Sequence, residues 1–172
     1  MRQSNPINIH REITPLKQAD CFMVFERSRK AFNYPIHFHP EVELNFIYKA
    51  EGAKRIVGDH IGEIGKRELV LVGSNLYHGW ENDKNNKEQE FKEITIQFPA
   101  SIFQEELLER NLMLPIRNML RNADRGILFA ERTIKSVESK LFALSKTQGF
   151  DGFLLFQSLL YDLAISDASE CR

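Results

Sequence analysis

The most informative run in this sequence is Tyr34-Pro35-Ile36-His37-Phe38-His39-Pro40-Glu41-Val42-Glu43-Leu44. It contains His37, His39 and Glu43 at positions of the same parity. Because side chains alternate between the two faces of a β-strand, an extended run turns these three groups to one side. His78 follows after a further β-rich stretch and can reach the same place from a neighbouring strand. Imidazole and carboxylate groups bind first-row divalent metals, and without a metal they form a polar pocket for a small molecule.

A simpler interpretation of the run is a half-buried antiparallel strand. Apolar side chains such as Val42 and Phe46 alternate with polar ones, and this pattern is common where one face of a strand meets water. The histidines would then be exposed. Against this, the chain has only 5 histidines, yet two of them lie two residues apart beside a correctly spaced glutamate. The sequence therefore favours a site.

Two more residues share the parity of this site. Asn45 follows Glu43 by two positions, and Trp80 follows His78 by two positions, so both are predicted to face the same pocket. The predicted ligand-binding residues are His37, His39, Glu43, Asn45, His78 and Trp80, and the predicted metal ligands are His37, His39, Glu43 and His78. The ligand types do not distinguish Zn, Ni, Mn and Fe.

Length and composition are those of a globular protein with one well-buried core. The chain has 172 residues, 42% of them hydrophobic, and a net charge of −1. Because phosphate contacts need concentrated positive charge, we do not expect this chain to bind DNA by itself. Its two cysteines, Cys21 and Cys171, suggest neither a disulfide framework nor a zinc knuckle. With no signal peptide or membrane span in the sequence, we expect a cytoplasmic location and no membrane partner.

The pattern changes near residue 100 from short β-rich runs to a helical period. Runs that read as strands are residues 21–26, 41–49, 55–57, 68–72 and 91–98. After Pro99, apolar residues recur at three and four positions, as amphipathic helices require. We therefore predict a mainly β fold with C-terminal helices: a jelly-roll β-barrel over 1–100, followed by a helical hairpin over 101–172 that links and dimerises.

Two motifs carry a resemblance to a known family. The segment His37-Phe38-His39-Pro40-Glu41-Val42-Glu43-Leu44-Asn45 resembles the first cupin motif, and Leu71-Val72-Gly73-Ser74-Asn75-Leu76-Tyr77-His78-Gly79-Trp80 resembles the second. Together with the helical stretches around Gly126 and Leu160, they resemble the N-terminal cupin domain of arabinose-regulator (AraC) type transcription factors, over roughly residues 20–166. Asn75 replaces a family glycine in the turn before His78, and asparagine tolerates a positive φ.

The resemblance implies the effector-binding and dimerisation domain of a bacterial transcriptional regulator, which senses a small molecule, with a sugar as the candidate, in the barrel. It implies no enzymatic activity. DNA would be read only through a C-terminal helix-turn-helix domain. Since the sequence stops at Arg172 without such a segment, we expect a fragment of a longer protein.

Two alternatives stay open. One is a metal-dependent cupin enzyme, an isomerase or oxygenase, for which Glu41 is the only nearby acid or base that we can nominate. The other is an interaction module whose barrel is filled with its own side chains. The wide apolar stripe of the last helix predicts a homodimer, which would suit a regulator. The predicted interface residues are Leu155, Leu159 and Leu163.

Overall fold

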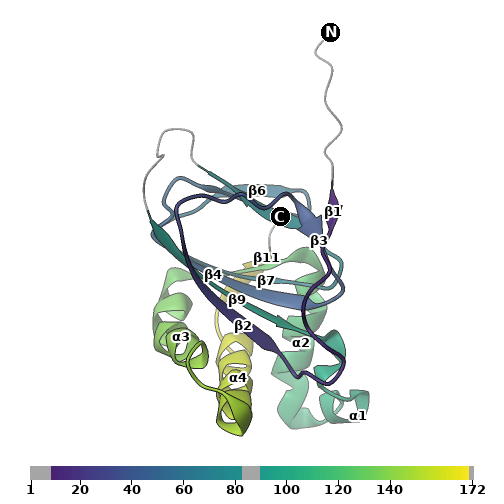
Figure 1. Cartoon of the computed structure of the whole chain (residues 1–172). Helices are drawn as coiled ribbons and strands as arrows, with labels where there is room; N and C mark the ends of the chain where they lie inside the picture. Colours follow the sequence, from purple (N-terminus) through teal and green to yellow (C-terminus); the bar gives the residue numbers. More distant parts are fainter. Residues whose placement is uncertain (1–8, 83–89, 171–172) are drawn as a thin grey trace.

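The computed structural model describes residues 9–82 and 90–170, in which two β-sheets face each other and helices cover the outside of one of them (Figure 1). The smaller sheet has the order β1 (His10–Arg11), β3 (His37–Phe38), β8 (His78–Glu81), β5 (Lys54–Val57) and β6 (His60–Glu63). The larger sheet has the order β11 (Ala168–Glu170), β10 (Ile127–Phe129), β7 (Arg67–Val72), β4 (Val42–Tyr48), β9 (Phe91–Phe98) and β2 (Met23–Arg29). Across the described ranges the two sheets share no ladder of hydrogen bonds, so the observed architecture is a pair of sheets.

The central strand β4 shows how alternation builds this architecture. Val42, Leu44 and Phe46 point to the outer face of the larger sheet and belong to the main hydrophobic core. Glu43 and Asn45 point to the opposite face, toward the smaller sheet, and they too are buried. Both faces of β4 are therefore buried. The interpretation as a half-exposed strand is wrong, because the polar face points into the space between the two sheets and not into bulk water.

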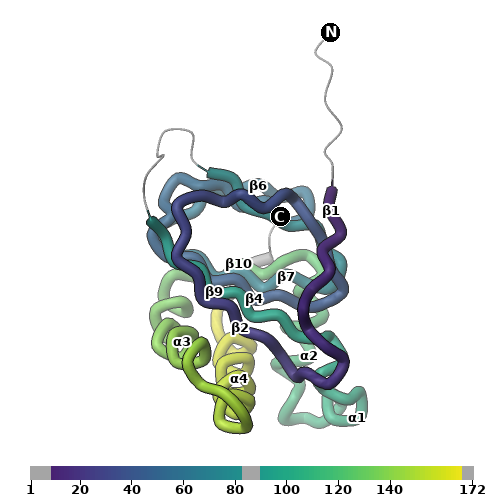
Figure 2. Tube along the Cα trace, in the orientation of Figure 1, coloured from purple at the N-terminus to yellow at the C-terminus, as the bar shows by residue number. Residues whose placement is uncertain are grey.

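Helices cover the outer face of the larger sheet (Figures 1 and 2). They are α2 (Leu114–Asn122), α3 (Glu131–Leu144) and α4 (Gly149–Ala164), and α1 (Glu105–Leu108) packs against α2. Three 3-10 turns lie at Ala100–Ile102, Asn111–Met113 and Ala123–Arg125. Pro115 lies in the first turn of α2, where its missing N–H costs no hydrogen bond. In α3 the predicted apolar positions, from Ile134 to Leu144, are buried against the sheet.

The segment after residue 100 also contributes strands, which the sequence patterns did not predict. β10 pairs with β7 of the larger sheet, and β11 pairs with β10. A single hydrophobic core joins β4, β7 and β9 to α2, α3 and α4. Residues before and after 100 thus share one hydrophobic core. The domain boundary at residue 100 remains a prediction. Within the described ranges, no helix has the length and apolar character to cross a bilayer.

The predicted dimer-interface residues need correction. Leu159 and Leu163 are 0% and 1% exposed in the single chain, and Leu155 packs, partly buried, against the same core. The reason is that α4 lies between α2 and α3 on the sheet, so its inner stripe is already covered. The exposed apolar residues of α4 are instead Phe150, Leu154 and Tyr161, with Ile165 directly after the helix.

Candidate metal and ligand site between the sheets

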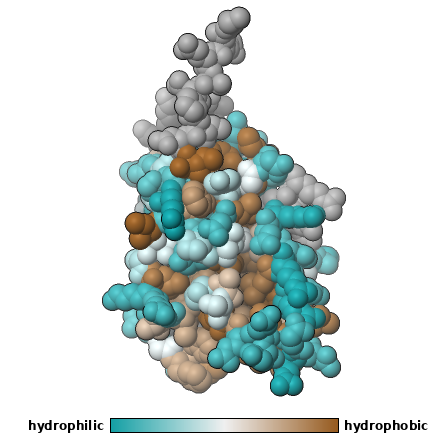
Figure 3. All heavy atoms as spheres, turned by 90° about the vertical axis from the view of Figure 1, so that its right-hand side faces the viewer, coloured by the Kyte–Doolittle hydropathy of each residue, from teal (hydrophilic) through white to brown (hydrophobic). Residues whose placement is uncertain are grey.

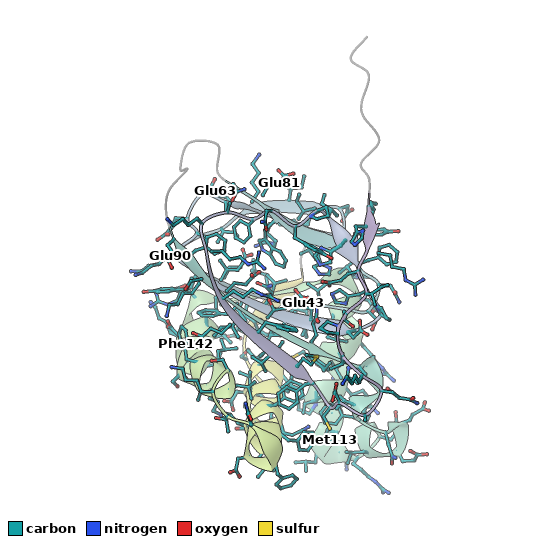
Figure 4. All side chains as sticks on the ribbon, in the orientation of Figure 1. Glu43, Glu63, Glu81, Glu90, Met113 and Phe142 are labelled. Carbon is teal, nitrogen blue, oxygen red and sulfur yellow. The ribbon has the colours of Figure 1, made fainter. Side chains whose placement is uncertain are left out.

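The structure brings the four predicted metal ligands together. His37, His39, Glu43 and His78 each offer a ligand atom, these atoms all lie within 4.8 Å of one another, and all four residues are buried. His37 and His78 lie opposite each other on the paired strands β3 and β8. Glu43 approaches from β4 in the other sheet, and Figure 4 shows it between the two sheets.

The route to this convergence differs from the predicted single strand. The chain leaves the smaller sheet after Phe38, bends at Pro40 and Glu41, and enters the larger sheet at Val42. The histidines therefore face the glutamate across the interior, although they are close in sequence. The two motifs are also tied together, since the Asn75 N–H donates to the His39 carbonyl at 2.8 Å. Asn75 has the positive φ expected of that turn, 60°.

Each imidazole at the site is oriented by a backbone carbonyl. The Nδ1 atoms of His37, His39 and His78 lie 2.9, 3.1 and 2.9 Å from the carbonyl oxygens of Pro35, Glu41 and Leu76. A carbonyl can only accept, so in each case Nδ1–H donates, and the lone pair of a neutral ring lies on Nε2. This is the outer hydrogen bond that metal-binding histidines ordinarily make.

The Nε2 atoms meet the Glu43 carboxylate. His39 Nε2 lies 3.2 Å from Glu43 Oε2, and His78 Nε2 lies 3.8 Å from Glu43 Oε1. Within the described part of the chain, the buried Nε2 of His78 has no hydrogen-bond partner. A lone pair without a donor inside a protein is unfavourable, and a cation at the centre of the cluster would satisfy it.

The protonation states of these groups differ. Burial, followed by the neighbouring His78, lowers the pKa of His37 from 6.5 to about 4. Burial also lowers the pKa of His39, but the hydrogen bond and charge of Glu43 outweigh it and leave that pKa above 6.5. Burial raises the pKa of Glu43, yet its contacts with His39 and His78 hold it well below 4.5. At neutral pH the site thus contains a carboxylate and at least one neutral imidazole.

A polar wall from β4 and β9 continues the site. Asn45 Nδ2 lies 3.3 Å from Glu43 Oε1 and 3.3 Å from Thr95 Oγ1, and Gln97 Nε2 donates to Glu43 Oε2 at 3.0 Å. Glu93 is part of the same wall. The sequence reasoning missed all three β9 residues. Their signal was the alternation of Glu93, Thr95 and Gln97 with apolar residues in a predicted strand.

The N-terminal strand adds a group that the sequence reasoning also missed. Glu12 follows β1, and its Oε2 lies 3.7 Å from Nε2 of both His37 and His39. No local pattern marks this glutamate, because only the pairing of β1 with β3 brings it near the histidines.

Trp80 lies on the other side of the site and is held by a buried ion pair. Its Nε1–H donates to Glu68 Oε1 at 3.2 Å, and the second oxygen of Glu68 pairs with Arg55. A Cβ on Gly62 would collide with the Arg55 guanidinium, so the glycine gives this side chain its space. The Trp80 and His78 rings meet edge to face, with centroids 6.0 Å apart.

The site opens into a cavity of about 200 Å³ between the sheets. Its polar side is formed by Glu43, Asn45, Glu93, Thr95 and Gln97, and its aromatic side by Phe25, Phe32, Tyr34 and Trp80. His37 and Glu12 line the end nearest the metal ligands. Of the predicted ligand-binding residues, His37, Glu43, Asn45 and Trp80 line this cavity, and His39 and His78 lie behind them.

Comparisons with known proteins give partial likenesses. The sequence matches no family model and no curated protein. Similar solved structures include ToxT from Vibrio cholerae O395, an AraC-family regulator, with 14% identity and a TM-score of 0.49 over 83% of this chain and 55% of ToxT. A cupin 2 conserved barrel domain protein from Rhodopseudomonas palustris matches with 12% identity and a TM-score of 0.38, over 48% of this chain and 55% of that chain. These likenesses assign no function.

The third similar structure corrects one expectation. Salicylate 1,2-dioxygenase from Pseudaminobacter salicylatoxidans matches with 19% identity and a TM-score of 0.39, over 45% of this chain and 22% of its own. This finding contradicts the expectation that the chain has no enzymatic activity, and so partial a likeness gives the chain no activity of its own either. The site gives the physical reason: three imidazoles and a carboxylate beside a cavity can also serve metal catalysis.

Proposed function

We propose that this chain is the effector-binding domain of an AraC-type transcriptional regulator, built on a cupin barrel, and that a small molecule binds in the cavity between its sheets. The observation that carries the proposal is the cavity between the sheets, which has one polar and one aromatic side. Specific ligand sites combine apolar walls with a few well-placed polar groups in this way. The two sequence motifs that resemble the regulator family supply the residues at one end of this cavity.

A sugar is the effector class that we favour. Glu43, Asn45 and Gln97 offer acceptors and amide donors to hydroxyl groups, and Trp80 offers a flat apolar surface to the ring. Trp80 is well suited to this role because Glu68 fixes its indole N–H. A ligand with several hydroxyl groups would donate to Asn45 Oδ1 and Gln97 Oε1, which have no hydrogen-bond partner among the described residues, and an apolar ligand would leave these two oxygens unpaired.

A divalent metal at His37, His39, Glu43 and His78 is part of the proposal. The donor set fits: three Nε2 atoms and one carboxylate converge, each Nδ1 is engaged by a carbonyl, and Nε2 of His78 lacks a partner among the described residues. The bound ion would act as a Lewis acid that anchors an oxygen of the ligand at the end of the cavity. Zn, Ni, Mn and Fe all suit these ligands.

The larger sheet would couple ligand binding in the cavity to the position of the helices. On β4, Glu43 and Asn45 face the cavity, while Val42 and Leu44 between them contact the helical layer. A ligand that shifts β4 would therefore also shift the residues that contact the helices. This requires that the ligand binds one conformation of the domain more tightly than the other. In the complete regulator we propose that a homodimer presents C-terminal DNA-reading domains to paired half-sites.

The second candidate function is that of a metal-dependent isomerase or oxygenase of the cupin class. The position of the four metal ligands at the end of the cavity favours it, because a substrate in the cavity would reach the metal. Glu41, the nominated acid or base, is placed poorly for this. Its Oε2 lies 3.5 Å from Nδ1 of His39, on the side away from the metal ligand atoms, and it does not line the cavity.

The emission of Trp80 provides the test, because it is the chain's one tryptophan and it lines the cavity. Purified protein, stripped of metal and then loaded with Mn²⁺ or Zn²⁺, is titrated with a panel of monosaccharides. We expect a saturable change in emission and a rise in melting temperature for one class of sugar, since a ligand of the native state stabilises it. Absence of any response to metals and sugars would refute the proposal, and turnover of a panel compound would establish the enzyme instead.

A further inference from the structure

Glu12 brings a second carboxylate to the histidine cluster from a segment distant in sequence. Its Oε2 is equally close, at 3.7 Å, to the Nε2 atoms of His37 and His39, the atoms that carry the ligand lone pairs. Its side chain is 22% exposed, so it lies at the edge of the cluster and reaches inward.

The backbone fixes this position. β1 runs parallel to β3, with His10 opposite His37 and Arg11 opposite Phe38. The His10 N–H donates to the Ile36 carbonyl, and the Glu12 N–H donates to the Phe38 carbonyl, both at 3.0 Å. The pairing of the strands thus places the Glu12 backbone beside the two histidines.

The two carboxylates share one amide group. Gln97 Nε2 lies 3.0 Å from Glu43 Oε2 and 3.4 Å from Glu12 Oε2. Two carboxylates this close repel each other when both are ionised. Around them stand three imidazoles, and the buried Nε2 of His78, which is 1% exposed, has no hydrogen-bond partner among the described residues. A divalent cation at this centre would offset the repulsion between the two carboxylates and would accept the lone pair of His78 Nε2.

We propose that Glu12 is a fifth ligand of the metal ion, so that the metal fastens the N-terminal strand to the site. This inference rests on the proposed metal site. Two carboxylates neutralise a divalent ion, and three neutral imidazoles complete the set. Because structural zinc is ordinarily four-coordinate and oxygen ligands suit manganese, the fifth ligand shifts the preference of the site toward ions that accept higher coordination.

The test compares two glutamates whose carboxylates lie within 4 Å of a histidine of the site, Glu12 at 3.7 Å and Glu41 at 3.5 Å. Glu12→Gln removes the carboxylate on the Nε2 side. Glu41→Gln removes a carboxylate 3.5 Å from Nδ1 of His39, on the opposite side of the ring. Both variants change the net charge equally, so a general electrostatic effect would affect both alike. Mn²⁺ and Zn²⁺ affinities are measured by competition with a chelator, and amide hydrogen exchange over residues 10–12 is followed with and without metal.

We expect Glu12→Gln to lower Mn²⁺ affinity by about tenfold or more, in line with the loss of a metal ligand or its close support. Zn²⁺ affinity should fall less, and Glu41→Gln should change either by less than about threefold. Metal should slow exchange at residues 10–12 in the wild type and in Glu41→Gln, but not in Glu12→Gln.

Two results would overturn the inference. Equal affinities in the two variants, with the wild type binding one equivalent of metal, would remove Glu12 from the site and leave the proposed metal function intact. A wild-type protein that binds no metal would refute both the role of Glu12 and the proposed metal site.

Discussion

At the scale of single residues, the site depends on which nitrogen of each imidazole carries the proton. The carbonyls of Pro35, Glu41 and Leu76 accept from Nδ1, and the Nε2 atoms are thereby directed toward Glu43. The same arrangement favours protonation of His39 in the metal-free protein, because Glu43 stabilises the charged imidazole. Metal and proton therefore compete for one atom, Nε2 of His39.

This competition predicts the pH dependence of metal binding. His39 has a pKa above 6.5, so below that pKa a proton must leave before the metal binds, and affinity should rise about tenfold per pH unit. Above it the affinity should level off. His37, with a pKa of about 4, is already neutral in this range and should contribute no slope. Calorimetric titrations between pH 5.5 and 8.5 would measure this, and a flat profile would contradict it.

The ion pair behind Trp80 gives a second prediction at this scale. Glu68 and Arg55 are both 3% exposed, and burial raises the pKa of Glu68 even though Arg55 opposes the shift. Glu68→Leu leaves the guanidinium buried without its partner, which should cost about 3–5 kcal/mol of unfolding free energy. The double variant Arg55→Leu/Glu68→Leu should recover most of this loss, because no unpaired charge remains.

Urea unfolding followed by Trp80 fluorescence would measure both variants. Emission in the native state should change in each of them, since the indole N–H loses Glu68 as its acceptor. A single variant as stable as the double variant would show that the pair carries no such coupling.

At the scale of elements, α4 has two apolar stripes with different roles. Phe156, Leu159, Leu160 and Leu163 fill the core between the sheet and the neighbouring helices. On the opposite side Phe150, Leu154 and Tyr161 remain exposed. By contrast, the face that carries β1 and α1 intersperses hydrophobic with hydrophilic residues (Figure 3). An outer stripe along one helix is the better candidate for a twofold contact.

We therefore predict that the homodimer forms through the outer stripe of α4. Leu154, which is 51% exposed, is the residue to change. Leu154→Glu should convert a micromolar dimer to monomer, because a charge would be buried at the contact. Leu107→Glu on α1, at a similar exposure of 47%, should leave the dimer intact. Sedimentation equilibrium would decide, and a monomeric wild type would end the prediction.

Leu159 serves as the internal control on the same helix. Since it is fully buried, Leu159→Ala should lower the unfolding free energy by about 2–5 kcal/mol through the cavity it leaves. Leu154→Ala should change the stability of the isolated monomer by less than about 0.5 kcal/mol. Comparable losses of unfolding free energy in the two variants would contradict the assignment of Leu159 to the core and Leu154 to the surface.

At the scale of the whole molecule, the larger sheet joins the cavity to the helices. One core spans β4, β7 and β9 on one side and α2, α3 and α4 on the other, and Arg67 on β7 adds an ion pair to Glu138 on α3. A barrel over 1–100 without its helices would expose the outer faces of these strands. The two predicted parts should therefore unfold together.

This prediction is tested by following unfolding with two probes. Trp80 fluorescence reports on the cavity side, and far-ultraviolet circular dichroism at 222 nm reports mainly on the helices. We expect coincident transitions, as two-state behaviour requires. A fragment of residues 1–100 should fail to give a cooperative transition. Separate transitions, or a folded fragment, would establish the division at residue 100 as a true domain boundary.

The sequence by itself determined the local content of the site and of most elements. Strand parity grouped Glu43 with Asn45 on β4 and His78 with Trp80 on β8, and apolar spacing located α3 and α4. These features depend on neighbours along the chain, since strand and helix periods fix which side chains share a face. Short elements without such a period, among them β1, β6, β10 and β11, were not predicted.

Only the tertiary structure decided what each face meets. The polar face of β4 looks the same in the sequence whether it meets water or a second sheet, and the packing of the sheets encloses it. In the same way, the packing of α4 between α2 and α3 covers Leu159 and exposes Leu154. Glu12 reaches the histidines because β1 pairs with β3. These outcomes depend on contacts between residues far apart along the chain, which no local period encodes.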